Sequence, residues 1–286
     1  MQLNHIVVAV DDSGVGRHAL AEGVALAALS RARVTAVTAI AARPLAAPSA
    51  AMSAARDARE NMLPPALADL EARVRAVVPA DSGVSVTSDV TYGIPGIEIC
   101  HFAELQNADL LVLGRKRRSH AERLLIGDTA DAVARRSRVP CLFVPGDAPV
   151  GGPLLVAVDG GPRAARVVRA AYDLATQLGW PLRLLTVEPG TEQEPDDLGE
   201  LLAADRRERL SAIFRAAVPE APVGAAELVV RHGDVVSRVL EAAEGGGAGV
   251  LVVGYRRGGP PGVAELGSVA RRLAHGAACP VLTIPL

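Results

Sequence analysis

The sequence predicts two tandem α/β domains of one fold, each a doubly wound sheet of five parallel strands. The first observation is an internal repeat: residues 112–145 return at 252–285, and IVVAVDD at 6–12 returns as LLVAVDG at 154–160. The second is that short apolar runs alternate with segments of helical length in both copies. Because parallel strands need helical crossovers, this alternation predicts helices on both faces of each sheet.

The repeat also indicates where the domains meet. Its two offsets are 140 and 148 residues, so the second copy lacks eight residues that the first contains. The segment GDAPVGG at 146–152 combines glycine, proline and aspartate between two expected strands, as turns and linkers do. We therefore expect one domain at 1–148 and a second at 149–286, each of ordinary domain size.

In the first copy, short runs rich in β-branched residues predict buried parallel strands. Between them, apolar residues recur at helical spacing, as Val15, Ala19 and Val24 do. The stretch 41–52 has no such period and is expected to be a loop. The expected strands are 5–10, 34–40, 84–90, 109–113 and 140–144, and the expected helices are 15–31, 53–78, 94–106 and 128–137.

The second copy follows the same order of elements. Its apolar runs and helical periods match those of the first copy one by one. The expected strands are 154–158, 182–187, 227–231, 249–253 and 280–284, and the expected helices are 162–178, 197–217, 234–244 and 268–276.

The composition argues for a globular protein without nucleic-acid or lipid partners. Hydrophobic residues make up 50% of the chain and charged residues 22%, which allows two sizeable cores. Aromatic residues are only 2%, so few side chains could stack on bases, and the net charge is -2. The single basic cluster, at 115–118, is a run typical of a solvated loop. We expect no binding to nucleic acid or membranes.

Cysteine usage and the first residues of the chain predict a cytoplasmic protein. Cys100, Cys141 and Cys279 are odd in number and lack metal-ligand spacing, so neither a disulfide framework nor a zinc site is expected. The sequence MQLNHIVVAV enters a strand pattern without a signal-peptide pattern. No uncharged apolar run is long enough to span a bilayer.

The residues that follow the expected strands point to a ligand site. In a doubly wound sheet, ligands bind outside the carboxyl ends of the strands, where the winding direction reverses. The first strand of each copy ends at Asp11 or Asp159, which could accept hydrogen bonds from a ligand or be ordinary turn residues. Gly127 and Gly267 each open a helix, whose first N–H groups lack intrahelical partners. Such a helix start is suited to holding phosphate.

These features together resemble the universal stress protein family. The shared pattern is an Asp after strand one, a glycine after strand four, a thirteen-residue step to a second glycine at a helix start, and a proline before the last strand. The resemblance covers nearly the whole chain as two copies. It implies a Rossmann-like fold of the adenine nucleotide alpha hydrolase-like kind. It also implies ATP, with or without Mg²⁺, as the cofactor, because ATP-binding members use this loop for ribose and phosphates.

The resemblance assigns ligand contacts to both copies. The aspartate after strand one and the residue near the end of strand two would lie near the adenosine. The end of strand four would lie beside the ribose, and the start of the following helix would contact the phosphates. In the second copy these residues are Asp159, Val187, Val253, Gly254, Arg257, Gly267, Ser268 and Val269, and in the first copy they are Asp11, Ala39, Leu113, Gly114, Arg117, Gly127, Asp128 and Thr129.

Both copies depart from the family pattern. Arg117 and Arg257 stand where the family has the glycine that lets backbone approach phosphate. The hydroxyl after the last glycine is kept as Ser268, whereas the first copy has Asp128. An aspartate there would cap the helix and place its own charge where phosphate should bind. We therefore expect the second domain to be the better ATP site. The alternative is that basic residues fold over the first site and offset this carboxylate, namely Arg115, Lys116, Arg117, Arg118 and Arg123.

Three functions fit these residues. The first is a regulatory, stress-response protein that binds ATP without efficient catalysis, because no Walker lysine or other catalytic signature is present. The second is a slow ATP hydrolase. The third is a nucleotide-free interaction module whose sites have degenerated, as the two arginines suggest. The family's use of its last strand in subunit contacts implies a homodimer or an intramolecular pseudo-dimer, and the protein partner cannot be named from the sequence.

Overall fold

In the computed structural model of this chain, the structure describes residues 1–42, 53, 56–116, 128–188, 197–255 and 267–286. The chain divides into two compact units. One comprises Leu3–Asp147, and the other comprises Ala148–Leu286 together with Met1–Gln2.

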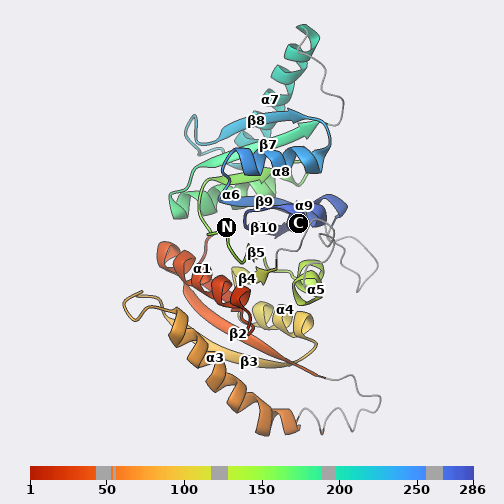
Figure 1. Ribbon diagram of the computed structural model, residues 1–286. Helices are drawn as coiled ribbons and strands as arrows, with labels where there is room; N and C mark the ends of the chain where they lie inside the picture. Colours follow the sequence, from red (N-terminus) through yellow and green to blue (C-terminus); the bar gives the residue numbers. More distant parts are fainter. Residues whose placement is uncertain (43–52, 54–55, 117–127, 189–196, 256–266) are drawn as a thin grey trace. The chain divides into compact units, whose positions relative to one another are not determined.

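The first unit contains five parallel strands in the order β3-β2-β1-β4-β5 (Figure 1). Every residue from Ile6 to Val8 in β1 is fully buried, as expected for a central strand covered on both faces. The strands are β1 (His5–Ala9), β2 (Arg33–Ala41), β3 (Val86–Gly93), β4 (Leu110–Arg115) and β5 (Cys141–Pro145).

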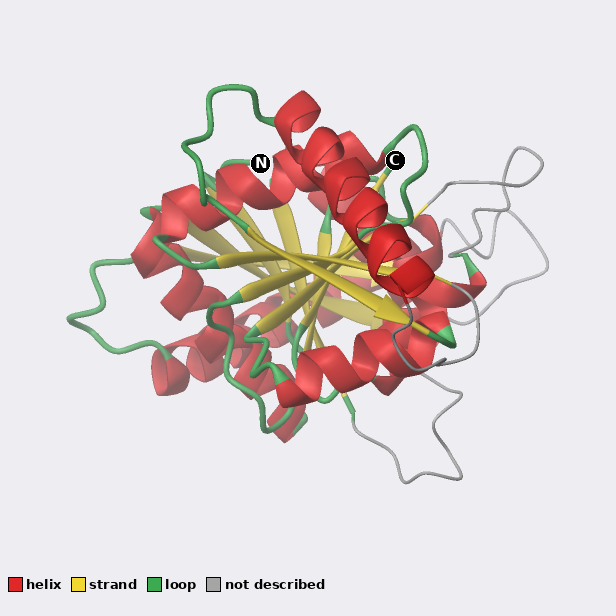
Figure 2. Ribbon diagram, turned by 90° about the horizontal axis from the view of Figure 1, so that it is seen from above, coloured by secondary structure: helices red, strands yellow, loops and turns green. Residues whose placement is uncertain are grey.

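Helices of the first unit form two groups. Helices α1 and α3 contact each other, as do α4 and α5, and each group contacts the strands. Figure 2 shows helices on both sides of the strands, which is the predicted layering. The helices are α1 (Gly14–Ser30), α3 (Leu63–Val77), α4 (Pro95–Leu105) and α5 (Asp128–Arg136).

The structure corrects the prediction of one regular helix over 53–78. A π-helical turn, η1 (Ala58–Met62), precedes α3, which begins at Leu63. Pro64 and Pro65 follow at once. Proline has no N–H to donate and is tolerated only in the first turn of an α-helix, so a new α-helix must start here.

The second unit repeats the first. Its parallel strands have the order β8-β7-β6-β9-β10, which is the same order about the central strand. Helices α6 and α7 contact each other, and so do α8 and α9. The strands are β6 (Leu154–Ala157), β7 (Leu182–Glu188), β8 (Glu227–His232), β9 (Val250–Tyr255) and β10 (Val281–Pro285), and the helices are α6 (Ala164–Leu178), α7 (Asp197–Ala217), α8 (Val235–Gly245) and α9 (Ser268–Gly276).

The strand order creates a topological switch point in each unit. The chain moves from β1 to β2 and β3 on one side and then crosses to β4 on the other side of β1. In the second unit, β6 and β9 hold the corresponding places. The carboxyl ends of these two neighbouring strands therefore border the crevice where doubly wound folds bind ligands.

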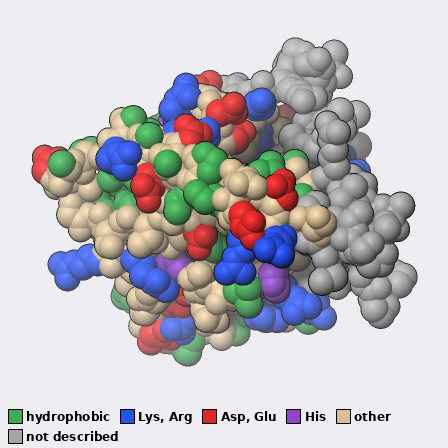
Figure 3. All heavy atoms as spheres, turned by 90° about the horizontal axis from the view of Figure 1, so that it is seen from below, with side chains coloured by type: hydrophobic (Ala, Val, Ile, Leu, Met, Phe, Trp, Pro, Cys, Tyr) green, Lys and Arg blue, Asp and Glu red, His purple; other side chains and the backbone are tan. Residues whose placement is uncertain are grey.

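Among the described helices, none has both the length and the hydropathy needed to cross a bilayer. On the face of the molecule drawn in Figure 3, basic and acidic side chains are mixed among hydrophobic ones. That face therefore presents charges of both signs.

Candidate functional site

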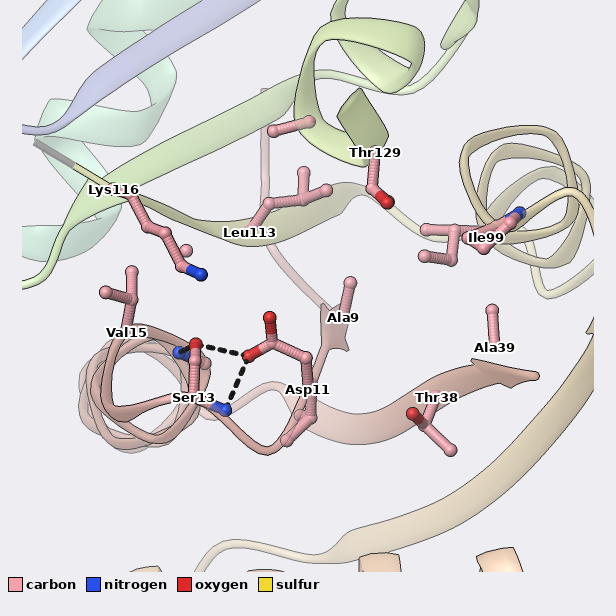
Figure 4. Close-up of a pocket in the computed structure, with 15 residues that line it drawn as sticks. Ala9, Asp11, Ser13, Val15, Thr38, Ala39, Ile99, Leu113, Lys116 and Thr129 are labelled. Atoms are coloured by element: carbon pink, nitrogen blue, oxygen red, sulfur yellow. Dashed lines mark hydrogen bonds between the residues drawn. The ribbon is translucent and has the colours of Figure 1, made fainter. Parts of the chain in front are cut away.

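A cavity of about 270 Å³ lies at the switch point of the first unit (Figure 4). The carboxyl ends of β1, β2 and β4 contribute to its walls, together with the N-terminal ends of α1, α4 and α5. It thus lies where the order of strands predicts a ligand site. Polar groups come from Asp11, Ser13, Thr38, Lys116 and Thr129, and aliphatic side chains supply much of the rest.

A hydrogen-bonded turn fixes Asp11 at the edge of this cavity. One carboxylate oxygen, Oδ1, accepts hydrogen bonds from the Ser13 N–H at 3.1 Å and the Ser13 hydroxyl at 2.5 Å. The Ser13 Oγ in turn accepts from the Gly16 N–H at 3.1 Å and so caps α1. Figure 4 shows the other oxygen of Asp11 pointing toward the interior of the cavity. The turn role and a ligand role are therefore compatible.

Lys116 brings a positive charge to the same cavity. It directly follows β4, and its side chain points toward the space beside Asp11 (Figure 4). Its neighbour Arg115 is the last residue of β4 and only 3% exposed, so this part of the basic run is not the solvated loop that the sequence predicts. A carboxylate and an ammonium facing one cavity suit a ligand that has both hydrogen-bond donors and negative charge.

Packing explains the glycine that ends strand four in both copies. A Cβ at Gly114 would lie 2.7 Å from Val15 Cγ1 and 2.8 Å from the Val15 carbonyl oxygen. At Gly254 a Cβ would lie 2.5 Å from Val167 Cγ2. The helix after strand one packs too closely on strand four to admit a side chain. The recurrence of this glycine is therefore required by the fold itself and is weak evidence for a ligand.

Gly267, at the start of α9, meets no such constraint from the described residues. None of their atoms would lie within 4 Å of a Cβ placed there, and its φ of -52° suits any residue. Its carbonyl accepts the first helical hydrogen bond, from the Arg271 N–H at 2.9 Å. The N–H groups of the first turn lack partners inside the helix, as at every helix start. A glycine here keeps the approach to these N–H groups open.

The structure brings together five of the eight predicted first-copy residues. Asp11, Ala39, Leu113, Gly114 and Thr129 all line the cavity. The backbone of Asp128 begins α5, next to Thr129. Arg117 and Gly127 lie outside the described residues, as does Arg257 of the second copy.

The predicted second-copy residues follow the ends of the corresponding elements. Asp159 comes two residues after β6, is exposed, and accepts a hydrogen bond from the Gly161 N–H at 2.9 Å. The other residues belong to the later parts of β7 and β9 or to the start of α9, namely Val187, Val253, Gly254, Gly267, Ser268 and Val269. The strand order places these elements around the switch point of the second unit.

Sequence reasoning missed several residues of the first cavity. Ser13 carried a detectable signal, because a serine just before a helical period is a common N-cap. Thr38 and Ile99 carried no detectable sequence signal, because only the folded structure brings their side chains to this edge of the sheet. The cavity residues that were not predicted are Ala9, Val10, Ser13, Val15, Gly16, Thr38, Pro95, Ile99 and Ala130.

Comparisons with known proteins agree with this architecture. The model of the Universal stress protein family matches twice, at residues 2–145 and 152–285. A universal stress protein of Mycobacterium tuberculosis H37Rv is 29% identical over 222 residues, which is 73% of this chain and 72% of the relative. One from Thermus aquaticus is 32% identical over 135 residues, which is 46% of this chain and 96% of the relative.

Solved structures share the fold over the whole chain. A universal stress protein from Archaeoglobus fulgidus has a TM-score of 0.70 at 18% identity and covers 100% of this chain and 99% of its own. A protein from Pseudomonas aeruginosa that has been assigned to the universal stress proteins gives a TM-score of 0.65 at 18% identity, and the match covers 99% of this chain and 93% of that protein. At these identities the similarity concerns the fold alone. It confirms the predicted α/β class with two tandem domains.

Proposed function

The chain belongs to the universal stress protein family, and we propose that it is a regulatory protein that binds ATP at the switch points of its domains. The observation that carries this proposal is the first-unit cavity, around which five residues predicted from the family pattern come together. Their convergence on one cavity at the expected edge of the sheet supports a common ligand.

The chemistry of the first cavity fits an adenine nucleotide. The inward oxygen of Asp11 would accept hydrogen bonds from hydroxyl or amino groups of the adenosine. Ala39, Ile99 and Leu113 offer apolar contact to a flat base, while Lys116 and the start of α5 would meet the phosphates. With Mg²⁺ bound to the nucleotide, the metal would offset further phosphate charge.

We place the stronger site in the second domain. Gly267 leaves the start of α9 open without being required by packing against the described residues, and Ser268 supplies a hydroxyl there. In the first domain the residue at the corresponding position is Asp128, and a negative charge at a helix start would compete with phosphate for the same N–H groups. Binding in both domains would then be unequal, with the second domain occupied at lower ATP concentration.

We propose binding without efficient turnover as the basis of regulation. Hydrolysis would need a group that activates water, and the described residues that line the first cavity include no histidine, no cysteine and no carboxylate other than Asp11. Slow hydrolysis at the bound phosphate remains the enzymatic alternative. ATP would instead bias the conformation or the assembly of the protein, including a homodimer.

A nucleotide-free interaction module is the second candidate. One observation favours it: Gly114 and Gly254, which the family pattern ties to the ligand, are already required by contacts with Val15 and Val167. The arginines at 117 and 257 point the same way, because each replaces a glycine of the pattern.

Calorimetric titration of nucleotide-stripped protein with ATP tests the proposal, and the titration is run once in the presence of Mg²⁺ and once in the presence of EDTA. We expect two binding events of different affinity, of which Asp159→Ala removes the tighter and Asp11→Ala the weaker. If a single binding event is seen and Asp159→Ala removes it, the proposed ATP binding stands but is limited to the second domain. The absence of any heat of binding would contradict ATP binding and favour the interaction module.

A further inference from the structure

The second unit contains a groove that has no part in the predicted nucleotide site. It has a volume of about 590 Å³ and lies between α8 and the edge strand β8. Leu155 and Val229 contribute apolar atoms to it, while Ala242 and Gly245 of α8 form a wall. Its volume is in the range of small-molecule sites.

Comparison of the two copies explains why the groove is open. The repeat offset of 140 residues aligns Ala242 with Phe102 of α4. Phe102 is only 8% exposed, so the first copy fills this position with a buried aromatic ring. Replacing that ring by a methyl group leaves space that the surrounding backbone does not close. Gly245, at the position of Leu105, removes another large side chain from the rim.

Three arginines line the groove where the first copy has no basic residue. The register of the strands and the repeat align Arg183, Arg231 and Arg238 with Thr35, Thr91 and Glu98. Two glutamates accompany the arginines in the groove, which leaves one excess positive charge among its lining residues.

The glutamates hold two of the arginines in fixed geometry. Arg183 Nε lies 2.6 Å from Glu227 Oε2, and its Nη1 donates to the Gly246 carbonyl oxygen at 2.7 Å. Arg238 Nη1 donates to Glu241 Oε2 at 2.7 Å. Because these contacts already restrict the two arginine side chains, less side-chain conformational entropy would be lost when a ligand binds.

Arg231 has no ion-pair or hydrogen-bond partner in the part of the chain that the structure describes. It projects from β8 on the same face as Glu227 and Val229, because side chains two residues apart in a strand share a face. Its guanidinium therefore supplies the uncompensated charge beside an apolar floor.

We propose that this groove binds a small organic anion, a compact apolar body carrying one phosphate or carboxylate group. The planar guanidinium of Arg231 matches either head group with two parallel hydrogen bonds, while Leu155, Val229 and Ala242 contact the body. Since Asp159, Gly267 and Ser268 do not line the groove, this site is separate from the proposed ATP site. The second copy would thus bind a second kind of ligand that the first copy cannot accommodate.

Titration of the full chain with phenyl phosphate and with benzoate, followed by ligand-observed NMR, tests this site. The two probes share an aromatic ring and differ in the anionic head, so the tighter binder identifies the head group. Arg231→Gln should weaken binding by about tenfold or more, because it removes a charged hydrogen-bond donor. Arg209→Gln removes the same charge from an exposed position of α7 outside the groove and should leave binding unchanged.

Ala242→Phe provides a test that leaves all charges in place. It installs the residue of the first copy and should abolish binding of both probes by filling the groove. Circular dichroism melting checks that this variant folds, and Arg231→Gln decides the question if it does not. The proposal is overturned if neither probe binds, or if both probes bind the folded Arg231→Gln and Ala242→Phe variants as they bind the original protein.

Discussion

The imidazole of His5 lies with its Nδ1 atom 3.1 Å from the carbonyl oxygen of Gln106, the residue that follows α4. Its Nε2 atom is 2.9 Å from the Thr35 hydroxyl, which lies 3.1 Å from the Thr87 hydroxyl. In the second copy, Arg183 occupies the position of Thr35 and donates to the carbonyl oxygen of Gly246, the counterpart of Gln106. Both domains therefore satisfy the same helix-end carbonyl, but with different residues.

His5 is expected to make the first domain sensitive to acid. Burial lowers the pKa of His5 below its ordinary value of 6.5, and nearby Arg33 acts in the same direction, although the Gln106 carbonyl and Asp109 raise it. The unfolded chain therefore binds a proton at a higher pH than the folded one. The stability that neutral His5 contributes is complete above the unfolded pKa of about 6.5 and is lost as pH falls toward the lowered folded pKa.

Urea unfolding between pH 8 and pH 5 measures this effect. The unfolding free energy should fall more steeply with acidification in the original protein than in His5→Gln, whose amide does not titrate but can bond to both Gln106 and Thr35. NMR titration of the ring gives an independent check. A His5 pKa at or above 6.5 would contradict the prediction.

Much of the fold could be predicted because strand and helix periods are local. The runs at 5–10 and 34–40, for example, fall on strands of the structure, in which residues 5–8 and 34–37 are buried. The π-helical turn before α3 was missed because apolar spacing does not reveal which N–H groups find partners. The first-copy cavity was predicted only in part, since Thr38 and Ile99 reach it through long-range packing.

The packing role of Gly114 also could not be predicted from the sequence. Its contact is with Val15, on a helix that is adjacent only after the sheet has formed. A motif can show that a glycine recurs, but it cannot show whether a ligand or another part of the chain occupies the place of its side chain.

Gly114→Ala should therefore destabilise the first domain whether or not ATP is present. The new methyl group would lie under 3 Å from Val15 side-chain and backbone atoms, and overpacking of this kind costs about 1–3 kcal/mol. Urea unfolding without nucleotide measures the loss. Gly151→Ala is the matched control, since a Cβ there meets no atom of the described residues within 4 Å. Equal stabilities of the two variants would show that the Val15 contact does not require glycine.

Gly267→Val should have the opposite profile, with ATP binding in the second domain lost and stability nearly kept. A Cβ at this position touches no atom in the part of the chain that the structure describes, so that part accommodates it, but a branched side chain would cover the first N–H groups of α9. Replacing glycine at an N-cap by an apolar residue lowers stability by about 1 kcal/mol at most. Calorimetry with Mg-ATP and urea unfolding separate the two effects. Unchanged ATP affinity in the folded variant would remove α9 from the site.

Exchanging the residues that begin α5 and α9 tests why the two domains should differ in ATP affinity. Asp128→Ser removes a carboxylate from the helix start of the first domain, and Ser268→Asp introduces one in the second. A charge at a helix N-terminus contributes about 1–2 kcal/mol in favourable geometry, so ATP affinity should rise roughly fivefold to thirtyfold in the first domain. It should fall by a similar factor in the second.

These exchanges are best measured with the other domain silenced. Asp128→Ser is combined with Asp159→Ala, and Ser268→Asp with Asp11→Ala, so that each titration reports one site. Charge competition also predicts that the difference in ATP affinity between each variant and its parent becomes smaller as the salt concentration rises, because salt screens the charge of the carboxylate. If Asp128→Ser does not raise ATP affinity while Ser268→Asp lowers it, the carboxylate of Asp128 does not limit ATP binding in the first domain. Arg117, which replaces the glycine of the family pattern, would then be the residue to exchange next.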